Sequence, residues 1–502
     1  SSSSTLLTQP ASDDPAAAPN AARKRRLDVV EGIDSFVTVG GYERFRASPS
    51  PSPSPASPVA SGVRRRPSPP TVGLLAAQER PQNDRMARYH IETYGCTSNR
   101  GESRAIESAL RDAGHYRVEG PEEADVAIMN TCTVVEKTER NMLRRAKELE
   151  EETADLIVTG CMALAQGEEF REEDVDAQIL HWDDVPSAVT NGECPTPGPD
   201  TEPVLDGVVG ILPIARGCMS NCSYCITKFA TGRVDSPPVE ENVEKARALV
   251  HAGAKEIRIT GQDTGVYGWD DGDRKLPELL DRICSEIDGE FRVRLGMANP
   301  GGVHGIHEEL ADVFAEHDEL YNFIHLPVQS GSDTVLADMR RQHRVDKFVE
   351  IVETFDERLD YWTLSTDFIV GFPTETEADH EQSMALFREV RPEKVNVTRF
   401  SKRPGTDAAE MKGLGGTVKK ERSKAMSELK MDVVAEAYES MVGETRRVMV
   451  VQEGTGDSVK CRDDAYRQII VQNASEHGVE PGDFLDVEVT GHQTVYAFGK
   501  PV

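Results

Sequence analysis

Three cysteines stand close together near the middle of the chain, in the segment Cys218-Met-Ser-Asn-Cys222-Ser-Tyr-Cys225. Thiolates are the ligands that iron–sulfur clusters and zinc select. A structural zinc site takes four ligands, and no fourth Cys or His stands nearby in the sequence. Three thiolates on a cluster of four irons leave one iron open to chelate the amino and carboxylate groups of S-adenosylmethionine. The alternative is a zinc site or an incidental group.

Three other cysteines are far apart in the sequence but share a context: Thr-Tyr-Gly-Cys96, Asn-Thr-Cys132 and Val-Thr-Gly-Cys161. Each stands where a predicted strand ends. Ligands gather outside the carboxyl ends of parallel strands, so these thiols are expected to converge. They predict a second cluster with an open iron, and the alternative is three buried cysteines that act as small apolar side chains. Cys194, Cys284 and Cys461 have no partner at metal spacing and are interpreted as incidental.

The segments around the widely spaced cysteines alternate between strand and helix patterns. Strands are predicted at 89–94, 125–130, 155–159 and 177–181, and helices at 102–113 and 137–150. This order predicts a doubly wound parallel α/β domain over residues 86–195. The Pro/Gly-rich stretch 194–199 is interpreted as a linker.

A longer alternation follows over residues 204–437. Strands are predicted at 210–215, 256–260, 292–296, 322–326, 364–370 and 394–400, with helices such as 240–252, 377–389 and 418–440. Six β/α units predict a partial (β/α)6 barrel. Residues 438–502 contain five short β runs separated by Gly/Asp turns, at 448–451, 459–462, 468–471, 484–490 and 494–497. They predict a small OB-like β-barrel, so the fold class is multidomain α/β.

The 502-residue chain is too long for one core. Residues 1–85 are rich in Ser, Pro and Ala, which predicts a disordered low-complexity extension, and Met86 is the expected natural start. No run of about 18 apolar residues occurs and no apolar signal segment stands at the beginning. Neither a membrane span nor secretion is expected, and the predicted location is the cytoplasm.

The formal net charge of −30 argues at first sight against a nucleic-acid partner. An acidic, Lys-poor surface is also typical of proteins from very salty cytoplasm. At about 1 M salt the Debye length is about 3 Å, so net charge steers little and contact geometry dominates. Both interpretations are open from charge alone.

Several stretches together resemble the radical S-adenosylmethionine (radical SAM) methylthiotransferase family: 92–99, 130–134, 160–161, 215–218, 261–263, 326–333 and 367–373. The resemblance covers residues 88–502 and implies an N-terminal cluster domain, a radical SAM core and a C-terminal TRAM domain that binds RNA. Cys96, Cys132 and Cys161 would hold an auxiliary 4Fe–4S cluster. Cys218, Cys222 and Cys225 would hold the radical-generating 4Fe–4S cluster, with S-adenosylmethionine as cofactor.

Met-Ser-Asn inside the cysteine loop and Phe-Ala-Thr-Gly-Arg233 after it resemble the archaeal and eukaryotic branch that acts on tRNA. That branch converts N6-threonylcarbamoyladenosine, 3′ of the anticodon, to its 2-methylthio form. As a mechanistic hypothesis, cleavage of S-adenosylmethionine gives a 5′-deoxyadenosyl radical that abstracts hydrogen from an inert adenine C–H. A sulfur held by the auxiliary cluster, methylated by a second S-adenosylmethionine, is then delivered to that carbon.

Further site residues are expected where barrel strands end. The resemblance places Tyr224, Gln262 and Asp263 near S-adenosylmethionine, and Gln329, Ser330, Gly331 and Ser332 near its ribose. Gly371-Phe-Pro373 is expected near the adenine. The alternative for each is a turn that only requires Gly or Ser. Arg233 and Lys228 are expected either to pair with a carboxylate of cofactor or substrate or to be surface charges.

The C-terminal barrel carries the basic residues that are expected to contact tRNA: Arg446, Arg447, Lys460, Arg462, Arg467 and Lys500. Tyr466 and Tyr496 are candidate stacking platforms for bases, and a solvated face is the alternative. The expected partners are tRNA and an electron donor such as ferredoxin or flavodoxin, and a monomer is expected. Two rival functions are methylthiolation of a ribosomal-protein aspartate and RNA binding by a non-enzymatic zinc protein.

Overall fold

The computed structural model describes residues 86–133, 136–190, 192 and 201–502. The extension 1–85 and the whole predicted linker 194–199, including Cys194, lie outside the described residues. Among the helices of the described part, none is both long and apolar enough to cross a membrane.

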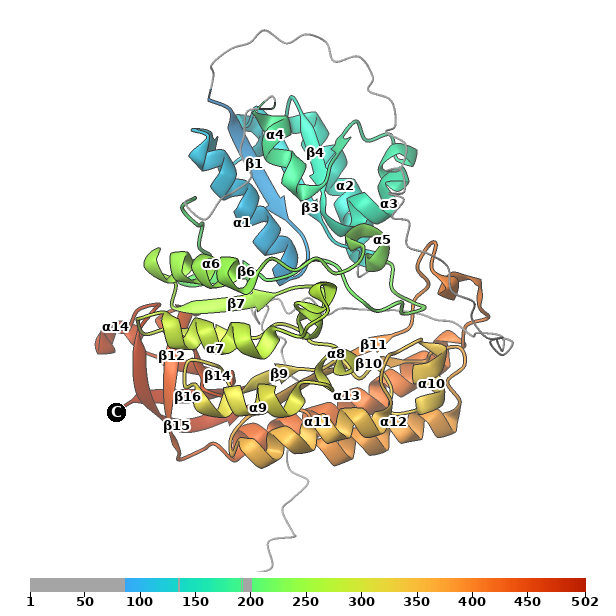
Figure 1. The fold of residues 1–502 in the computed structure, drawn as a ribbon, viewed down its shortest axis with the longest axis vertical. Coiled ribbons are helices and arrows are strands. Elements are labelled where there is room, and N and C mark those ends of the chain that lie inside the picture. The colour runs from blue at the N-terminus through green and yellow to red at the C-terminus, as the bar shows by residue number, and fades with distance from the viewer. Residues whose placement is uncertain (1–85, 134–135, 191, 193–200) are drawn as a thin grey trace, which may run out of the picture. The chain divides into compact units, whose positions relative to one another are not determined.

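The first folded region is a parallel sheet of five strands in the order β2-β1-β3-β4-β5 (Figure 1). The sheet is doubly wound, because α1 and α4 pack on one face through Ile106 and Val185, whereas α2 and α3 pack on the other through Met142 and Phe170. The strands are β1 (Arg88–Thr93), β2 (Tyr116–Arg117), β3 (Val126–Thr131), β4 (Leu156–Thr159) and β5 (Gln178–Ile179). The helices are α1 (Thr97–Asp112), α2 (Glu136–Glu152), α3 (Gly160–Glu172) and α4 (Val185–Val189), with short 3-10 turns at Pro121–Glu123 and Trp182–Asp184.

The second region contains six parallel strands in two three-stranded sheets, β6-β7-β8 and β11-β10-β9. Isolated bridges between Val293 and Leu320 and between Met297 and His325 join β8 to β9, which confirms the six-stranded partial barrel. The strands are β6 (Val209–Pro213), β7 (Glu256–Thr260), β8 (Arg292–Arg294), β9 (Phe323–His325), β10 (Thr363–Val370) and β11 (Lys394–Arg399).

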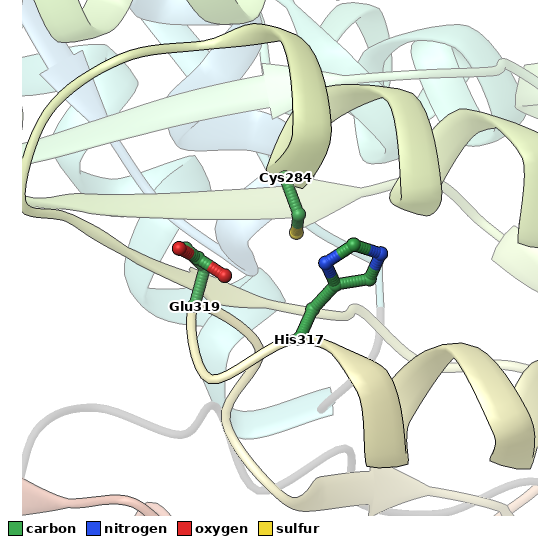
Figure 2. Close-up of side chains that lie close together, drawn as sticks. All are labelled: Cys284, His317 and Glu319. Carbon is green, nitrogen blue, oxygen red and sulfur yellow. The ribbon is translucent and has the colours of Figure 1, made fainter.

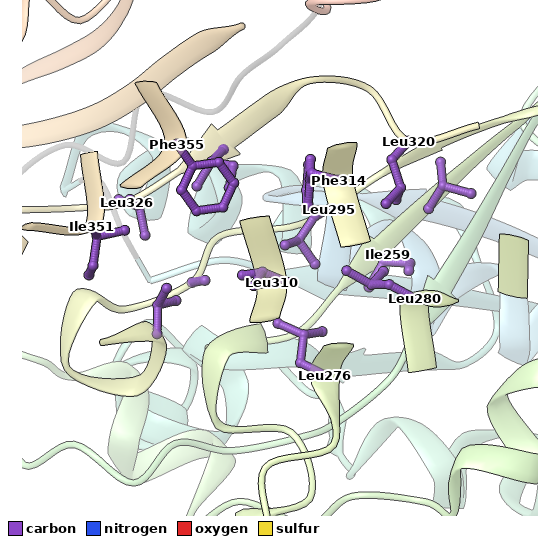
Figure 3. Close-up of a cluster of buried hydrophobic side chains, with 14 of the residues drawn as sticks. Ile259, Leu276, Leu280, Leu295, Leu310, Phe314, Leu320, Leu326, Ile351 and Phe355 are labelled. Carbon is purple, nitrogen blue, oxygen red and sulfur yellow. The ribbon is translucent and has the colours of Figure 1, made fainter. Parts of the chain in front are cut away.

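The helices of this region cover the outside of the strands (Figure 1). They are α5 (Thr227–Thr231), α6 (Val239–His251), α7 (Leu276–Glu286), α8 (Pro300–Val303), α9 (His307–Glu316), α10 (Asp333–Asp338), α11 (Val345–Arg358), α12 (Glu377–Val390) and α13 (Gly416–Glu439). Short 3-10 turns lie at Thr264–Val266, Trp269–Asp271 and Asp407–Glu410. Leucine, isoleucine and phenylalanine side chains of these helices meet the strands in one continuous core, part of which is shown in Figure 3. Each such side chain stabilises the fold by about 1.5–3 kcal/mol when fully buried, which fixes the strand ends that carry the polar residues.

The last region is a closed barrel with the strand order β12-β13-β14-β16-β15. β14 and β16 pair in parallel, and the other neighbouring strands are antiparallel. Its elements are β12 (Thr445–Glu453), β13 (Ser458–Asp463), β14 (Gln468–Gln472), α14 (Ala474–His477), β15 (Phe484–Gln493) and β16 (Tyr496–Pro501). Val434 and Tyr438 at the end of α13 belong to the core of this barrel, and the Tyr438 hydroxyl accepts a hydrogen bond from the Gln468 amide at 3.1 Å. The predicted OB-like barrel is therefore confirmed.

Candidate functional site

Cys96, Cys132 and Cys161, the sheet set, follow three neighbouring strands of the N-terminal sheet. β1 pairs with β3 and β3 pairs with β4, all in parallel, so the three strands end at one edge. Cys96 caps α1, Cys132 directly follows β3, and Cys161 is the second residue of α3. The topology thus brings together three thiols that are far apart in the chain, as the sequence predicted.

Two glycines allow the chain to turn so tightly at this edge. Gly160 has a φ of +89°, and a Cβ there would overlap the Asn130 side chain and the Thr131 carbonyl. Gly95 has a φ of +131°, and its Cβ would lie 2.9 Å from the Cβ of Cys132. Larger residues at either position would force the cysteine-bearing turns apart.

The sheet set lies among amides and one carboxyl group, with Cys132 buried and Cys96 and Cys161 half-buried. The Asn99 amide donates to the Asn130 side chain at 2.9 Å, and Asn130 in turn donates to Glu102 at 3.3 Å. Burial raises the pKa of Cys96, and it raises the pKa of Glu102 to about 7. The pKa of Cys161 is also raised by burial and by the negative charges of Glu102 and the other thiolates. The raised pKa values mean that Cys96 and Cys161 are neutral thiols without a metal, and a cationic metal cluster would supply the positive charge that stabilises their thiolates.

Cys218, Cys222 and Cys225, the loop set, lie in the turn between β6 and α5. Gly217 has a φ of +78°, and a Cβ there would overlap the Arg233 carbonyl, so the loop start requires glycine. The Gly217 amide donates to the Gln262 side chain at 2.6 Å. Burial, followed by the Asp263 charge, raises the pKa of Cys218 to about 12. The loop set also fits a cationic cluster, because its three thiols are held close together by one segment.

Arg341 supports the loop set from the other side of the barrel. Its guanidinium lies 3.7 Å from the Cys222 sulfur and 3.5 Å from the Tyr224 hydroxyl. It also donates to the Asn299 side chain at 3.0 Å and to the Pro327 carbonyl at 2.6 Å. The sequence interpretation missed Arg341, which stands 116 positions beyond Cys225 and belongs to no cysteine motif. A buried cation beside a thiolate stabilises the ionised sulfur that a metal requires.

The two cysteine sets adjoin each other. The Cys225 thiolate contributes to the raised pKa of Cys161, and Ala165 of α3 packs against the apolar group around Cys222. Two polar contacts hold the domains at this junction: Ser98 lies 3.2 Å from the Thr260 hydroxyl, and Arg403 pairs with Glu139 at 2.7 Å. Both side chains of the Arg403–Glu139 pair are at least 93% buried, because their exposed fractions are 1% and 7%. The two cysteine sets therefore lie at one junction between the N-terminal domain and the radical core.

Asp263 and Gln262 follow β7, as predicted, at the side of the loop set. Burial raises the pKa of Asp263 to about 6, although its carboxylate accepts hydrogen bonds from the amides of Asn299 at 2.9 Å and Gly265 at 3.2 Å. Asp263 also lies 3.8 Å from the Cys218 sulfur. This buried acid and the Gln262 amide offer polar groups for the amino-acid portion of S-adenosylmethionine.

The expected ribose residues divide into two groups. Ser332 caps α10, accepting from the Val335 amide at 3.5 Å and donating to Asp379 at 2.6 Å, and Ser330 accepts from the Ser332 amide at 3.2 Å. Both hydroxyls therefore hold the turn, which is the alternative that the sequence left open. Gln329 has a φ of +73°, and its backbone bonds to β10, because its amide donates to the Asp367 carbonyl at 2.8 Å and its carbonyl accepts from the Ile369 amide at 2.9 Å.

Three polar residues inside the barrel were not predicted as site residues. Asp367 accepts a hydrogen bond from Asn396 at 2.6 Å and lies 3.2 Å from a ring nitrogen of His325. Burial alone would raise the pKa of Asp367, but His325 and Asn396 lower it below its ordinary value. The available signal was the charged or polar residue in otherwise apolar strands, at Ile-His325-Leu and Thr-Asp367-Phe.

An exposed aromatic side chain stands beside the loop set. Phe229 of α5 is 50% exposed, and the Lys228 ammonium lies 5.3 Å from its ring centroid. Arg233, two residues beyond the end of α5, is also exposed. Lys228 itself donates to Asn221 at 3.0 Å and to the Cys222 carbonyl at 3.3 Å, so it stabilises the loop. Phe229 and Arg233 therefore form an accessible rim next to the cysteines.

The structure corrects the expected RNA contacts of the C-terminal barrel. Arg462 and Arg467 are only 5% and 7% exposed, and Arg467 pairs with Glu393 at 2.6 Å. Tyr466 is 2% exposed and packs against Tyr321 with ring centroids 4.8 Å apart, so it is a core residue and not a stacking platform. These three predictions were wrong because residues 462–467 form the contact with the radical core and not an outer face.

Other residues of this barrel are more accessible. Arg446 has 22% of its side chain exposed, pairs with Glu444 and lies 3.7 Å over the Tyr361 ring. Arg447 is exposed and pairs with Glu290 at 3.0 Å. Tyr496 is partly exposed and packs edge-on against Phe498. Lys460 of β13 is partly exposed and Lys500 of β16 is exposed, so the accessible cations of the barrel lie on β12, β13 and β16.

Three family models match successive parts of the chain. The Uncharacterized protein family UPF0004 matches residues 88–181, the Radical SAM superfamily matches residues 212–387, and the TRAM domain matches residues 439–502. The sheet set lies within the first match and the loop set within the second.

Curated relatives match this chain over most of their length. A protein of Archaeoglobus fulgidus named "Probable threonylcarbamoyladenosine tRNA methylthiotransferase" is 37% identical, over 82% of this chain and 98% of that relative. A Danio rerio protein named "Threonylcarbamoyladenosine tRNA methylthiotransferase" is 32% identical, over 83% of this chain and 79% of that relative. The solved structure of the radical S-adenosylmethionine methyltransferase TsrM from Kitasatospora setae, with cobalamin and a 4Fe–4S cluster bound, aligns with a TM-score of 0.49 and 13% identity, over 65% of this chain and 77% of that one. From the curated relatives and the domain matches, the chain belongs to the threonylcarbamoyladenosine tRNA methylthiotransferase family of the radical SAM superfamily.

Proposed function

We propose that the protein is an enzyme that attaches a methylthio group to N6-threonylcarbamoyladenosine, 3′ of the anticodon in tRNA. The observation that carries the proposal is the junction of the two cysteine sets, where Ala165 of α3 packs against the apolar group around Cys222 and the charge of Cys225 raises the pKa of Cys161. A reaction that joins a sulfur atom to an unactivated adenine carbon requires radical generation and sulfur delivery at one place. The names of the curated relatives support the same substrate.

The proposed division of labour assigns one 4Fe–4S cluster to each set. When bound, the clusters would supply the electron that cleaves S-adenosylmethionine and the iron that carries the sulfur, which is chemistry that protein side chains lack. The loop set would leave one iron open for S-adenosylmethionine, and the sheet set would leave one open for sulfur. Gln262, Asp263 and Asn299 would orient the cofactor, and Arg341 would hold the loop around it.

The barrel interior is proposed to exclude water from the radical and to position the cofactor. Asp367, held by Asn396 and His325, and Gln329 lie where β10 and β9 deliver polar groups to the carboxyl end of the barrel. Gln329 would contact the ribose, since the hydroxyls of Ser330 and Ser332 already serve the turn. Tyr224, which is 3% exposed, would pack beside the cofactor without meeting solvent.

The tRNA is proposed to reach the site across the exposed rim at Phe229 and Arg233, with further contact on the TRAM domain at Arg446 and Arg447. The proposed domains are residues 86–195, 204–437 and 438–502, and this division is supported by family matches that lie within each range. An electron donor such as ferredoxin or flavodoxin, a monomeric enzyme and a cytoplasmic location complete the proposal.

The direct test is mass spectrometry of nucleosides from tRNA that carries threonylcarbamoyladenosine, after anaerobic incubation with enzyme, S-adenosylmethionine, a sulfur source and a reductant. The expected product is the 2-methylthio nucleoside. A parallel reaction with ribosomal protein tests the rival substrate, and product on protein but not on tRNA would contradict the proposal. Metal analysis tests the zinc-protein rival, because zinc without iron in anaerobically purified protein would rule out an enzyme of this class.

A further inference from the structure

A second group of side chains that could hold a metal ion lies at the ends of α7 and α9, two helices that cover the strands. The Cys284 sulfur, a ring nitrogen of His317 and a carboxylate oxygen of Glu319 all lie within 4.8 Å of one another. Figure 2 shows the three side chains pointing toward a common centre. Cys284 comes from the last turn of α7, His317 ends α9, and Glu319 stands in the turn before β9. Because helices end and strands begin there, the group lies at the opposite end of the barrel from the six cysteines of the two sets.

The orientation of His317 is fixed by a fourth residue. A carboxylate oxygen of Asp281, one turn before Cys284 on α7, lies 2.9 Å from Nε2 of His317. That contact places the imidazole proton on Nε2 and leaves a lone pair on Nδ1, the nitrogen that Figure 2 shows turned toward Cys284 and Glu319. A carboxylate that holds the second nitrogen of a histidine is the usual support of a metal-ligating imidazole.

The thiol of Cys284 is the least expected member of this group. It is 8% exposed, it forms no disulfide, and no hydrogen bond of its sulfur occurs within the described part of the chain. Burial raises the pKa of this thiol, and the charges of Glu319 and Asp281 raise it further. Glu316 adds a third carboxylate within 4.8 Å of His317 and Asp281. One imidazole thus stands among three carboxylates and a buried thiol, an arrangement that a divalent cation would neutralise.

We propose that Cys284, His317 and Glu319 bind one zinc ion, with water as the fourth ligand and Asp281 as the support of His317. Zinc accepts sulfur, imidazole and carboxylate ligands in tetrahedral geometry, whereas calcium and magnesium prefer oxygen alone. The ion joins α7 to the turn that leads from α9 into β9. It stabilises the folded state in proportion to the free zinc concentration, because the unfolded chain does not hold the three ligands together.

The test uses the full chain with its iron–sulfur clusters assembled under anaerobic conditions, so that the cluster cysteines are occupied. Co²⁺ is added as a spectroscopic substitute, and Zn²⁺ is then added as its competitor. The expected result is about one Co²⁺ per chain with a thiolate-to-cobalt charge-transfer band, displaced by Zn²⁺. Cys284→Ala is expected to abolish the band without changing the iron content. Cys461→Ala is the matched control, because Cys461 is a fully buried thiol of β13 with Arg462 as its one charged influence.

Two further variants keep the test decisive if Cys284→Ala fails to fold. Glu319→Gln removes one ligand, and Asp281→Asn keeps all three ligands but alters the support of His317. Loss of such a supporting residue weakens metal affinity by about 10–100-fold. Zinc is expected to raise the melting temperature of the wild type but not that of Glu319→Gln. A wild-type chain without the cobalt band, or equal zinc affinity in the wild type, Glu319→Gln and Asp281→Asn, would overturn the proposal.

Discussion

The loop set and the sheet set contain the same ligands but depend on different levels of structure. Cys218, Cys222 and Cys225 fall within eight consecutive residues, so one turn of the chain brings them together. Cys96, Cys132 and Cys161 are separated by 36 and 29 positions, and only the order of three parallel strands unites them. The loop set is therefore a local motif, whereas the sheet set is a property of the folded domain.

The electrostatic surroundings of the two sets also differ. The loop set lies beside one carboxyl group, Asp263 at 3.8 Å from the Cys218 sulfur, and also beside a cation, the Arg341 guanidinium at 3.7 Å from the Cys222 sulfur. The sheet set lies beside the Glu102 carboxyl group, which burial keeps partly protonated near neutral pH. A nearby cation favours electron uptake by a cluster, and a nearby carboxylate opposes it. The cation therefore suits the loop set for receiving an electron, which leaves the sheet set for holding sulfur.

The largest effect is expected when a cysteine of the loop set is replaced, and a cysteine outside both sets serves as the comparison. Cys222→Ala is expected to reduce deoxyadenosine formation and methylthiolation to background, because the remaining two thiolates cannot retain the cluster. Cys461→Ala should leave both activities intact. Chromatography of deoxyadenosine, together with nucleoside mass spectrometry, measures the two products. Product formation by Cys222→Ala at the wild-type rate would refute the role of the loop set.

A smaller effect is expected when the cation beside the loop is removed. Arg341→Met removes the guanidinium contacts with the Tyr224 hydroxyl and the Asn299 side chain. Hydrogen bonds to charged groups contribute about 1.5–3 kcal/mol each. We expect iron bound by the loop set to fall and deoxyadenosine formation to drop, with iron in the sheet set unchanged. Arg340→Met is the control, because Arg340 is a half-exposed neighbour that pairs with Asp407. Equal loss of iron from both sets would contradict the assignment of Arg341 to one of them.

Glu102, which lies beside the sheet set, is expected to make the stability of the protein depend on pH. In cluster-free protein the native pKa of about 7 lies above the ordinary value of 4.5, so the native state binds an extra proton between these values. The contribution of Glu102 to stability therefore declines as pH rises from about 4.5 to about 7 and is constant above that. Relative to the wild type, Glu102→Gln should gain up to about 3 kcal/mol between pH 5 and pH 8. Denaturant unfolding at the two pH values measures this gain, and a pH-independent difference would show that Glu102 ionises normally.

The smallest effect is expected at the exposed rim of Phe229 and Arg233, across which tRNA is proposed to reach the site. Phe229→Ala removes an exposed ring, and base stacking on an aromatic side chain contributes about 1–3 kcal/mol. We expect weaker tRNA binding, measured by anaerobic fluorescence anisotropy, with no change in deoxyadenosine formation without tRNA. Phe229→Tyr should restore most of the affinity. Unchanged affinity in Phe229→Ala would place the base elsewhere.

The same contrast explains what the sequence could predict. The loop set was evident from spacing, and the sheet set required the expected strand order, which apolar segments before Cys132 and Cys161 made visible. Helix α3 was not predicted, because its glycines weaken the helical pattern of apolar residues. In the structure its backbone also departs from helical angles at Gln166. Arg341 and Asn396 approach the site from distant segments, so no local pattern reveals them, whereas Asp367 had a local signal as a charged residue in an otherwise apolar strand.

Basic residues of the C-terminal barrel were predicted from composition alone, and this information cannot distinguish a surface arginine from a buried one. Arg462 and Arg467 are charged yet buried, since aromatic rings and Glu393 take the place of solvent. Cys284 was interpreted as incidental because its proposed co-ligands His317 and Glu319 stand more than thirty positions away. In both cases tertiary packing, and not residue type, decides the role.

The most direct test of the account is Cys132→Ala, assayed for iron, deoxyadenosine and methylthiolated tRNA in one anaerobic preparation. The account predicts about four irons per chain against about eight in the wild type, continued deoxyadenosine formation and no methylthiolated nucleoside. Wild-type product from Cys132→Ala, or loss of deoxyadenosine formation in a folded variant that retains the loop iron, would contradict the separation of the two sets.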